Sequence, residues 1–198
     1  MSSKDKRVLG QRKSGLFFVI SAPAGTGKTT LVDKLLNEFS CIKRSVTCTT
    51  RKAREGEVDG EHYHFISQEE FDKMAEEGAF LEYVSLFEHS YGTPKEWILD
   101  QENQGNHVVL VIDTQGAMKL KGKLDATFIF ISPPSIEELR TRMLNRRTES
   151  PESIERRLNE AERELSMLKL YDYNVINDDL DIAYEVLRSI FVAEEHKV

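Results

Sequence analysis

The sequence contains little cysteine and no long apolar run, and each absence excludes a class of protein. Cys41 and Cys48 are the two cysteines among 198 residues, and they form neither a C-x-x-C pair nor a disulfide framework. We therefore expect two free thiols in a reducing compartment. No apolar stretch approaches the length of a membrane span, and the start, "MSSKDKRVLGQRKSG", lacks the apolar centre of a secretory signal. These features predict a cytoplasmic protein without a membrane partner.

The chain also has fewer basic than acidic residues. The chain has 27 lysines and arginines against 34 acidic residues, a net charge of −7, so we predict no nucleic-acid partner. Basic residues gather within residues 1–13, which we expect to form a flexible tail. The sequence has no internal repeat and no low-complexity segment. Its length fits one domain, present as a monomer or a simple homo-oligomer.

Buried strands and helices follow one another along most of the chain. Apolar runs typical of parallel strands lie at 15–21, 107–113, 126–132 and 173–177. Apolar residues at helical spacing lie at 29–39, at 135–145, from Ser150 to about Tyr171 with Ser150 as N-cap, and at 180–191. The pattern predicts an α/β fold with three layers around a parallel central sheet.

Residues 45–94 have a different pattern. The string "VDGEHYHFIS" places an Asp-Gly turn before an alternation of polar and aromatic residues, which predicts antiparallel strands outside the parallel core. The same alternation explains the spacing of His62 and His64, and we therefore do not expect them to bind a metal. This stretch is expected to be a mixed insertion in the core fold.

A phosphate-binding loop follows the first strand. The string "SAPAGTGKTT" fits the consensus G-x-x-x-x-G-K-S/T except at its first place, which is alanine. Alanine matters there only if the backbone needs a conformation that glycine alone reaches. Backbone amides and a helix N-terminus would bind the phosphates of ATP, Lys28 would supply a charge and Thr29 would ligate Mg²⁺. The predicted ATP-binding residues here are Ala22, Pro23, Ala24, Gly25, Thr26, Gly27, Lys28 and Thr29.

Two longer strings carry a resemblance to a known family. "SVTCTTRKAREGEVDGEHYHF" and "GAFLEYVSLFEHSYGTP", together with the loop, resemble guanylate kinases from about Gly15 to Phe191. The resemblance implies a P-loop fold with a core (14–44 and 95–193), a nucleoside-monophosphate-binding insertion (45–94) and a helical lid (about 134–158). It also implies Mg²⁺-dependent phosphoryl transfer from ATP to GMP or dGMP, in purine metabolism.

The acceptor site can be outlined from chemistry and from this resemblance. Guanidinium forks suit a phosphate dianion, so Arg51 and Arg54 are candidates, with hydroxyl groups from Tyr63 and Tyr91. One carboxylate can accept from both N1–H and N2–H₂ of guanine, and the resemblance assigns this role to Glu82. It also assigns Thr93 to O6 and Ser45 to the base. Taken alone, Glu82 could instead lie on the exposed face of a strand.

Asp113, at the end of the run 107–113, leaves three interpretations open. It suits a magnesium ligand acting through water. The resemblance places it near guanine and the metal, although the acid that the family often has two residues earlier is Val111 here. An aspartate at a strand end is also common without any function.

Arginines are concentrated at 140–157. The resemblance makes Arg142 and Arg146 lid arginines and lets Arg157 reach between donor and acceptor, whereas Arg147 replaces a glycine of the family. With Lys28 and Arg51 these three are the predicted catalytic residues. The others (Arg140, Arg147 and Arg156) are expected to pair with Glu149, Glu152 and Glu155. Asn177 either contacts adenine, as the resemblance suggests, or caps the last helix.

The favoured interpretation is an enzyme. A non-catalytic binding module of the same family is a first alternative, but such modules tend to lose the phosphate loop and lid arginines, which are present here. A kinase for another small phosphate ester is a second alternative. Glu82 and Thr93, as a pair that reads guanine, argue against it.

Overall fold

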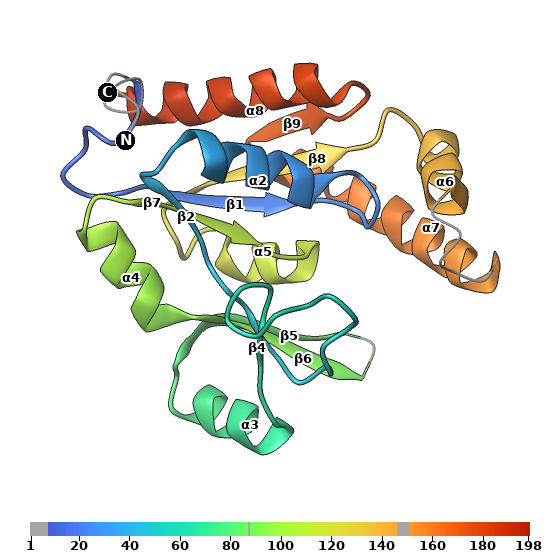
Figure 1. Cartoon of the computed structure of the whole chain (residues 1–198), viewed down its shortest axis with the longest axis horizontal. Coiled ribbons are helices and arrows are strands. Elements are labelled where there is room, and N and C mark those ends of the chain that lie inside the picture. The colour runs from blue at the N-terminus through green and yellow to red at the C-terminus, as the bar shows by residue number, and fades with distance from the viewer. Residues whose placement is uncertain (1–7, 87, 146–150) are drawn as a thin grey trace.

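A five-stranded parallel sheet forms the centre of the molecule. The computed structural model describes residues 8–86, 88–145 and 151–198 (Figure 1). The strand order is β2-β7-β1-β8-β9, and every pair in this sheet is parallel. The strands are β1 (Phe17–Ser21), β2 (Ile42–Arg44), β7 (His107–Val111), β8 (Ala126–Ser132) and β9 (Tyr173–Ile176). The predicted parallel core is confirmed.

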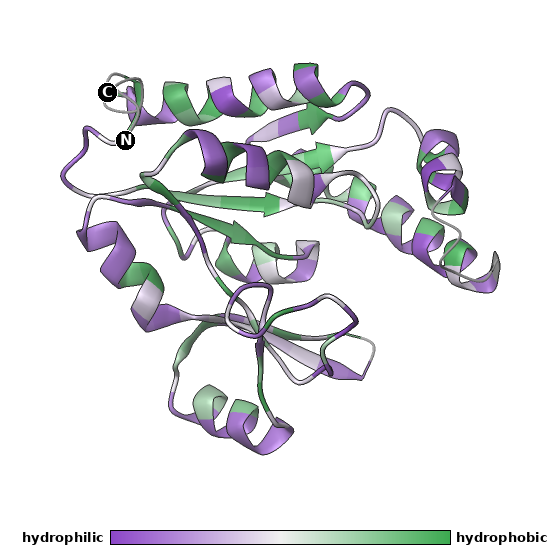
Figure 2. Cartoon of the chain, in the orientation of Figure 1, coloured by the Kyte–Doolittle hydropathy of each residue, from purple (hydrophilic) through white to green (hydrophobic). Residues whose placement is uncertain are grey.

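Helices cover both faces of this sheet, giving the three predicted layers. One face carries α2 (Lys28–Glu38) and α8 (Leu180–Glu195), and the other carries α4 (Lys95–Asn103) and α5 (Thr114–Leu120) (Figure 1). In β1, Phe18 packs toward the first face, where its ring stacks on Phe191 at 3.8 Å, while Phe17 packs toward the second. Burial on both faces explains why the central strands are apolar throughout (Figure 2).

A second, mixed sheet is built from the inserted segment. Its order is β4-β3-β6-β5, with β3 (Cys48–Thr49), β4 (His64–Phe65), β5 (Phe80–Leu86) and β6 (His89–Pro94). Helix α3 (Gln68–Glu76) covers it through Phe71, which stacks on Phe80 at 4.7 Å. The antiparallel arrangement expected around 58–67 is wrong, because β4 pairs parallel to β3. The long loop between β3 and β4 brings the chain back alongside β3, so that β4 runs in the same direction as β3.

Two helices project beyond the carboxyl ends of the central strands (Figure 1). They are α6 (Ile136–Asn145) and α7 (Pro151–Ser166), and they share a small core that includes Leu139, Met143, Ile154 and Leu158. Helix α7 ends at Ser166, earlier than expected, and a short 3-10 turn (Leu168–Leu170) leads to β9. The predicted N-cap, Ser150, lies outside the described residues.

The chain before β1 packs against α8, so the expectation of a flexible tail is wrong for residues 8–13. Leu9 is 1% exposed within the core. The backbone N–H of Gln11 donates to Glu195 Oε1 at 2.7 Å, and Arg12 donates to the Glu195 carbonyl at 3.2 Å. Residues 1–7 lie outside the description. In the part of the chain that is described, no helix has the length and apolar character needed to cross a bilayer.

A buried hydrogen bond between a histidine and a carboxylate joins this N-terminal segment to β7 and α8. The side chains of His107 and Glu195 are each 1% exposed, and His107 Nε2 contacts Glu195 Oε2. His107 Nδ1 accepts the backbone N–H of Leu16 at 3.0 Å, so the imidazole is neutral and Nε2–H donates. Burial lowers the pKa of His107, and Glu195 opposes this in part. Burial raises the pKa of Glu195, but the surrounding N–H donors outweigh it and the net shift is downward.

Replacing Glu195 by alanine should destabilise the fold markedly. The change leaves the buried His107 ring and the backbone N–H of Gln11 without their acceptor, which should cost about 3 kcal/mol. Urea denaturation at pH 7 would measure the loss. Glu185→Ala, an exposed position on the same helix, is the control and should change the free energy of unfolding little. Equal stability of the two variants would contradict a structural role for the pair.

Candidate functional site

The loop between β1 and α2 has the geometry of a phosphate cradle. Gly25 and Gly27 have φ angles of 92° and 88°, values that favour glycine. Ala22 is 4% exposed and packs in the core beside α2. Glu88 is the one non-glycine residue with positive φ among those described, so Ala22 has an ordinary backbone. The missing first glycine of the consensus is therefore no obstacle to the loop.

Asn177 joins this loop to the end of the central sheet. Its Nδ2 donates to the carbonyl of Thr26 at 2.6 Å, and the side chain is buried. The cap of α8 is Asp179, whose carboxylate accepts from the backbone of Asp181 and Ile182, so the capping alternative for Asn177 is wrong. A β-carbon at Gly27 would collide with Asn177 Nδ2. The position that sequence reasoning linked to ATP thus lies against the phosphate loop.

Ala22→Gly and Gly27→Ala, two substitutions in the phosphate loop, should differ in their effect on ATP binding. Ala22→Gly should keep ATP affinity and cost about 1 kcal/mol of stability, because it removes a buried methyl and frees the unfolded backbone. Gly27→Ala should lower ATP affinity at least about tenfold, because the new methyl strains the positive φ and displaces Asn177. Calorimetric titration with ATP and thermal unfolding would measure both. Loss of ATP binding in Ala22→Gly would contradict this account of the loop.

Lys28 and Asp113 follow the ends of the neighbouring strands β1 and β7, and their charges influence each other. Burial lowers the pKa of Lys28, and the charges of Glu164 and Asp113 oppose that shift. Asp113 caps α5, since its Oδ1 accepts the Gly116 N–H at 2.6 Å. Burial raises the pKa of Asp113, opposed by this hydrogen bond and by Lys28. Thr29, the predicted magnesium ligand, follows Lys28 in the first turn of α2 and is exposed.

Glu82 and Thr93 lie opposite each other on β5 and β6. The Thr93 hydroxyl donates to Glu82 Oε1 at 2.5 Å, while Glu82 Oε2 is buried without a partner. Glu82 is 6% exposed, so the alternative of an exposed strand face is wrong. Burial raises the pKa of Glu82 to about 7, and the Thr93 hydroxyl opposes the rise.

Gly116, which sequence reasoning missed, lets the two carboxylates approach each other. A β-carbon at this position of α5 would lie 2.8 Å from Glu82 Oε2 and 3.3 Å from Asp113 Oδ1. The glycine therefore allows the second sheet to bring Glu82 against α5, beside Asp113. Asp113 also adds a small upward contribution to the pKa of Glu82. An isolated glycine in a short helical segment was the signal that could have marked this close contact.

Four side-chain oxygens in the described chain are buried without a hydrogen-bond partner. They are Ser45 Oγ, Glu82 Oε2, Asp113 Oδ2 and Tyr171 OH. Buried polar groups are nearly always hydrogen-bonded, because an unmade bond leaves the cost of desolvation uncompensated. The resemblance assigned Ser45 and Glu82 to the acceptor base, and one of the interpretations of Asp113 placed it near guanine. Their placement indicates a site that a polar ligand completes.

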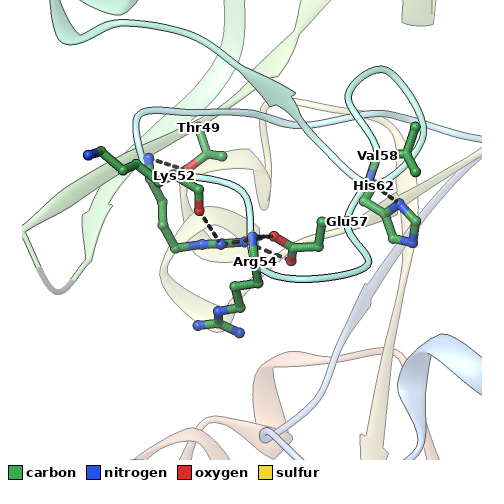
Figure 3. Close-up of polar contacts among 7 residues, drawn as sticks. Thr49, Lys52, Arg54, Glu57, Val58 and His62 are labelled. Carbon is green, nitrogen blue, oxygen red and sulfur yellow. Dashed lines mark hydrogen bonds and ion pairs between the residues drawn. The ribbon is translucent and has the colours of Figure 1, made fainter.

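Glu57, to which the sequence analysis assigned no role, holds Arg51 of the predicted phosphate site in place. The fork of Arg51 binds Glu57 through two hydrogen bonds of 2.9 Å, and its guanidinium lies over the rings of Tyr63 and Phe65. The Glu57 carboxylate also accepts the backbone N–H of Arg54 at 2.7 Å, while the Arg54 side chain points away from it (Figure 3). Glu57 lies within the first of the two strings that carry the family resemblance.

Two tyrosines of this lobe lie near Arg51, and a histidine stabilises the neighbouring loop. The rings of Tyr63 and Tyr91 meet edge to face at 6.1 Å. Tyr91 also contributes to the raised pKa of Arg51, after the larger effect of Glu57. His62 accepts the Val58 N–H at 3.1 Å through Nδ1, so its ring shapes the loop (Figure 3). Tyr63, Tyr91 and Arg51 therefore lie together, as the sequence predicted for a phosphate site.

The arginines of α6 and α7 take several positions. Arg142 donates to the Asn177 carbonyl at 2.8 Å and to Glu138 at 2.9 Å, which ties α6 to the end of β9. Arg140 pairs with Glu155, as expected for a structural arginine. Arg157 on α7 is half-buried and Arg156 is exposed. The predicted residues Arg146 and Arg147, with Glu149, lie outside the described residues.

These features together define a P-loop nucleotide phosphotransferase: a phosphate loop at the first strand–helix turn, and a second lobe that presents a carboxylate and arginines. Comparison with known proteins identifies the family. The family model described as guanylate kinase matches residues 15–194, and the chain belongs to the guanylate kinase family, whose activity is ATP:GMP phosphotransfer.

Individual guanylate kinases are similar in sequence to this chain over nearly its whole length. It is 54% identical over 189 residues to a guanylate kinase of Protochlamydia amoebophila, covering 96% of each protein. It is 50% identical to one from Caldanaerobacter subterraneus, covering 94% of this chain and 91% of the relative. The crystal structure of guanylate kinase from Anaplasma phagocytophilum aligns with a TM-score of 0.78 at 34% identity, covering 96% of this chain and 90% of that one. The predicted family and fold are confirmed.

Glu82→Gln should stabilise the ligand-free protein while it weakens GMP binding. The folded pKa of Glu82 is raised, so its carboxylate destabilises the fold once the pH exceeds the unfolded value of about 4.5. At pH 8 the variant should gain up to about 3 kcal/mol, and the gain should vanish near pH 4.5.

Denaturation at several pH values and titration with GMP would measure both effects. Glu76→Gln, at an exposed position of α3, is the control and should change neither. A variant that is destabilised at pH 8, or that keeps full GMP affinity, would remove Glu82 from the base site.

Proposed function

We propose that the 45–94 lobe binds GMP or dGMP, that the loop at 22–29 binds the phosphates of ATP, and that α6 and α7 act as the lid. The observation that carries this assignment is the set of buried, unpartnered oxygens on Ser45, Glu82 and Asp113. These oxygens are acceptors, or can act as acceptors, and guanine presents adjacent N–H donors on one edge. A ligand with that edge would satisfy groups that are otherwise costly to bury.

Guanine recognition rests on Glu82 and Thr93. Glu82 would accept from N1–H and N2–H₂, which requires both of its oxygens. The Thr93 hydroxyl, now donating to Glu82 Oε1, would rotate toward O6 and release that oxygen. Adenine has no donor at N1 and no N2 group, so it would leave the buried carboxylate unpaired. This arrangement should strongly favour guanine over adenine.

The phosphate of GMP is assigned to Arg51, Arg54, Tyr63 and Tyr91. Glu57 and the aromatic rings of Tyr63 and Phe65 fix the Arg51 guanidinium before the ligand arrives. A guanidinium that is already ordered loses less conformational freedom when it binds a phosphate. The exposed Arg54 side chain is free to swing toward the same anion.

On the donor side, backbone amides of the loop would bind the ATP phosphates and Lys28 would hold the γ-phosphate. The Asn177 side chain would border the adenine. Thr29 and the unpartnered Asp113 oxygen fit a magnesium ion, one as a direct ligand and the other through water. When bound, the ion would neutralise charge on the β- and γ-phosphates. Arg142, Arg146 and Arg157 would stabilise the charge that is shared during transfer.

The transfer itself needs alignment more than proton chemistry. An oxygen of the GMP phosphate attacks the γ-phosphorus as the bond to the bridging oxygen of ADP breaks. The acceptor is already ionised, so no general base is required. Lys28 and Arg51 hold the two phosphates in line, and closure of the lid would exclude water.

Two features favour a kinase over a non-catalytic module. The loop retains the glycine geometry that an anion requires, and the base site is held open by buried carboxylates. We further propose a cytoplasmic enzyme without nucleic-acid or membrane partners, acting as a monomer or simple homo-oligomer. The net charge of −7 supports the absence of a nucleic-acid partner.

An ADP-release assay across several acceptors tests the function. With Mg²⁺ and ATP, GMP and dGMP should react, IMP should react weakly because it lacks the N2 amine, and AMP should be disfavoured by at least about 10³-fold. UMP and CMP should be inactive, and EDTA should abolish turnover. Absence of turnover with GMP would defeat the proposed function, and equal rates for GMP and AMP would defeat the assignment of Glu82.

A further inference from the structure

One flank of helix α8 carries a stripe of exposed side chains without charge. Ile182 and Val186 are 67% and 43% exposed, and Ser189 and Ala193, also exposed, continue the same line toward the end of the helix. Their spacing of four, three and four residues keeps all four side chains on one side of the helix. The buried residues of α8 lie on a neighbouring side, which packs against the sheet and α2. The stripe is therefore a surface that the core does not use.

The same four residues line a groove at the margin of the molecule. The groove has a volume of about 680 Å³, and Tyr173 of β9 also lines it. Strand β9 is the last strand of the central sheet, and α8 lies along the outer margin beside it (Figure 1). Between β9 and the first turn of α8, Ile176 and Leu180 are exposed as well. An apolar groove next to further exposed aliphatic side chains is typical of a surface that binds another protein.

The order of side-chain sizes along the stripe makes it complementary to a second copy of itself. The two large side chains come first and the two small ones last. If two α8 helices pack antiparallel about a two-fold axis between residues 187 and 188, Ile182 faces Ala193 of the second copy. In the same register Val186 faces Ser189 of the second copy, and the symmetry repeats both contacts. A large side chain then lies opposite a small one at every contact, which is the arrangement that close helix packing favours.

The charges at the two ends of α8 agree with this register. Asp179, the N-cap, and His196, the C-cap, are both exposed and stand equally far from the axis, so that each faces the other across the pair. Lys197 is exposed beside His196, whereas Glu194 at the same end is half-buried and accepts the hydroxyl of Tyr173 at 2.6 Å. The antiparallel arrangement also brings opposite ends of the two helix dipoles together. A parallel arrangement would instead place Asp179 beside its own copy, where like charges repel.

Two other occupants of the groove fit less well. Residues 1–7 precede Val8, which lies near the end of α8, since His196 Nε2 contacts the Val8 carbonyl at 3.2 Å. That segment contains a single apolar side chain, Met1, and so does not match an apolar groove. A helix of an unrelated protein could cover the stripe, but it would not require the stripe to be complementary to its own reversed sequence.

We propose that the exposed stripe of α8 is a homodimer interface, in which two copies of this chain pack antiparallel through Ile182, Val186, Ser189 and Ala193. The wild-type chain is expected to be dimeric at micromolar concentration. The inference does not depend on the proposed function, because the stripe contains none of the residues assigned to ATP or GMP. Its test therefore needs no nucleotide.

Exchanging the two central residues of the stripe tests the register. Ser189→Val alone places two valines opposite each other at both central contacts and should weaken the dimer at least about tenfold, because the contacts become overpacked. The double variant Val186→Ser, Ser189→Val restores one large and one small side chain at each contact. It should dimerise within about threefold of the wild type. Sedimentation equilibrium of the full chain would measure the dissociation constants.

Val186→Glu and a matched control separate this surface from other routes to association. The variant brings two like charges close to the two-fold axis and should weaken the dimer at least about a hundredfold. Because Val186 is exposed, the monomer should remain folded, which thermal unfolding would check. Leu144→Glu makes the same kind of change at a comparably exposed position on α6 and should dimerise as the wild type does.

Three outcomes would overturn the inference. A wild-type chain that stays monomeric at about 100 µM would mean that the stripe serves another occupant. A dimer that survives Val186→Glu would place the interface elsewhere. A double variant that is as weak as Ser189→Val would contradict the antiparallel register.

Discussion

The structure depends on two carboxylates that are kept buried and incompletely paired at the junction of its two sheets. Glu82 comes from the second sheet and Asp113 from the first, and they meet across Gly116. Burial raises the pKa of both, so the ligand-free protein bears an electrostatic cost at this point. A side chain at residue 116 would push the lobes apart, and full pairing would remove the acceptors that a base can use. The close approach at Gly116 and the unpaired oxygens of the two carboxylates are therefore both needed for the site.

A second junction fixes the donor side. The Asn177 side chain holds the Thr26 carbonyl, and the Asn177 carbonyl receives Arg142 from α6. One residue at the end of β9 thereby connects the phosphate loop to the lid helices. The positive φ of Gly27 lets the loop pass this close to Asn177. Movement of α6 would be transmitted to the loop through a short chain of hydrogen bonds.

Sequence patterns predicted those parts of the fold and site that depend on the residues of one short segment. Strand β1 was recognisable because both of its faces are apolar, and Arg51, Glu82 and Thr93 belong to strings long enough to identify a family. The direction of β4 was not encoded, since alternation over two residues does not specify which strand it pairs with. Leu9 gave no signal, being a single apolar residue among charged ones. Helix α7 is charged on most of its surface, so the sequence pattern did not show that Glu164 is half-buried whereas Glu162 is exposed.

The same packing explains how an acidic protein can bind two polyanions. Three of the cations near the site already interact with an anion of the chain: Arg51 with Glu57, Arg142 with Glu138, and Lys28 more distantly with Glu164 and Asp113. The pairs of Arg51 and Arg142 hold long side chains in place and reduce the cost of burying their charge. At Lys28 the separation is larger, which leaves room for phosphate. Local pairing of this kind lets a chain with a net charge of −7 present ordered cations to its anionic ligands.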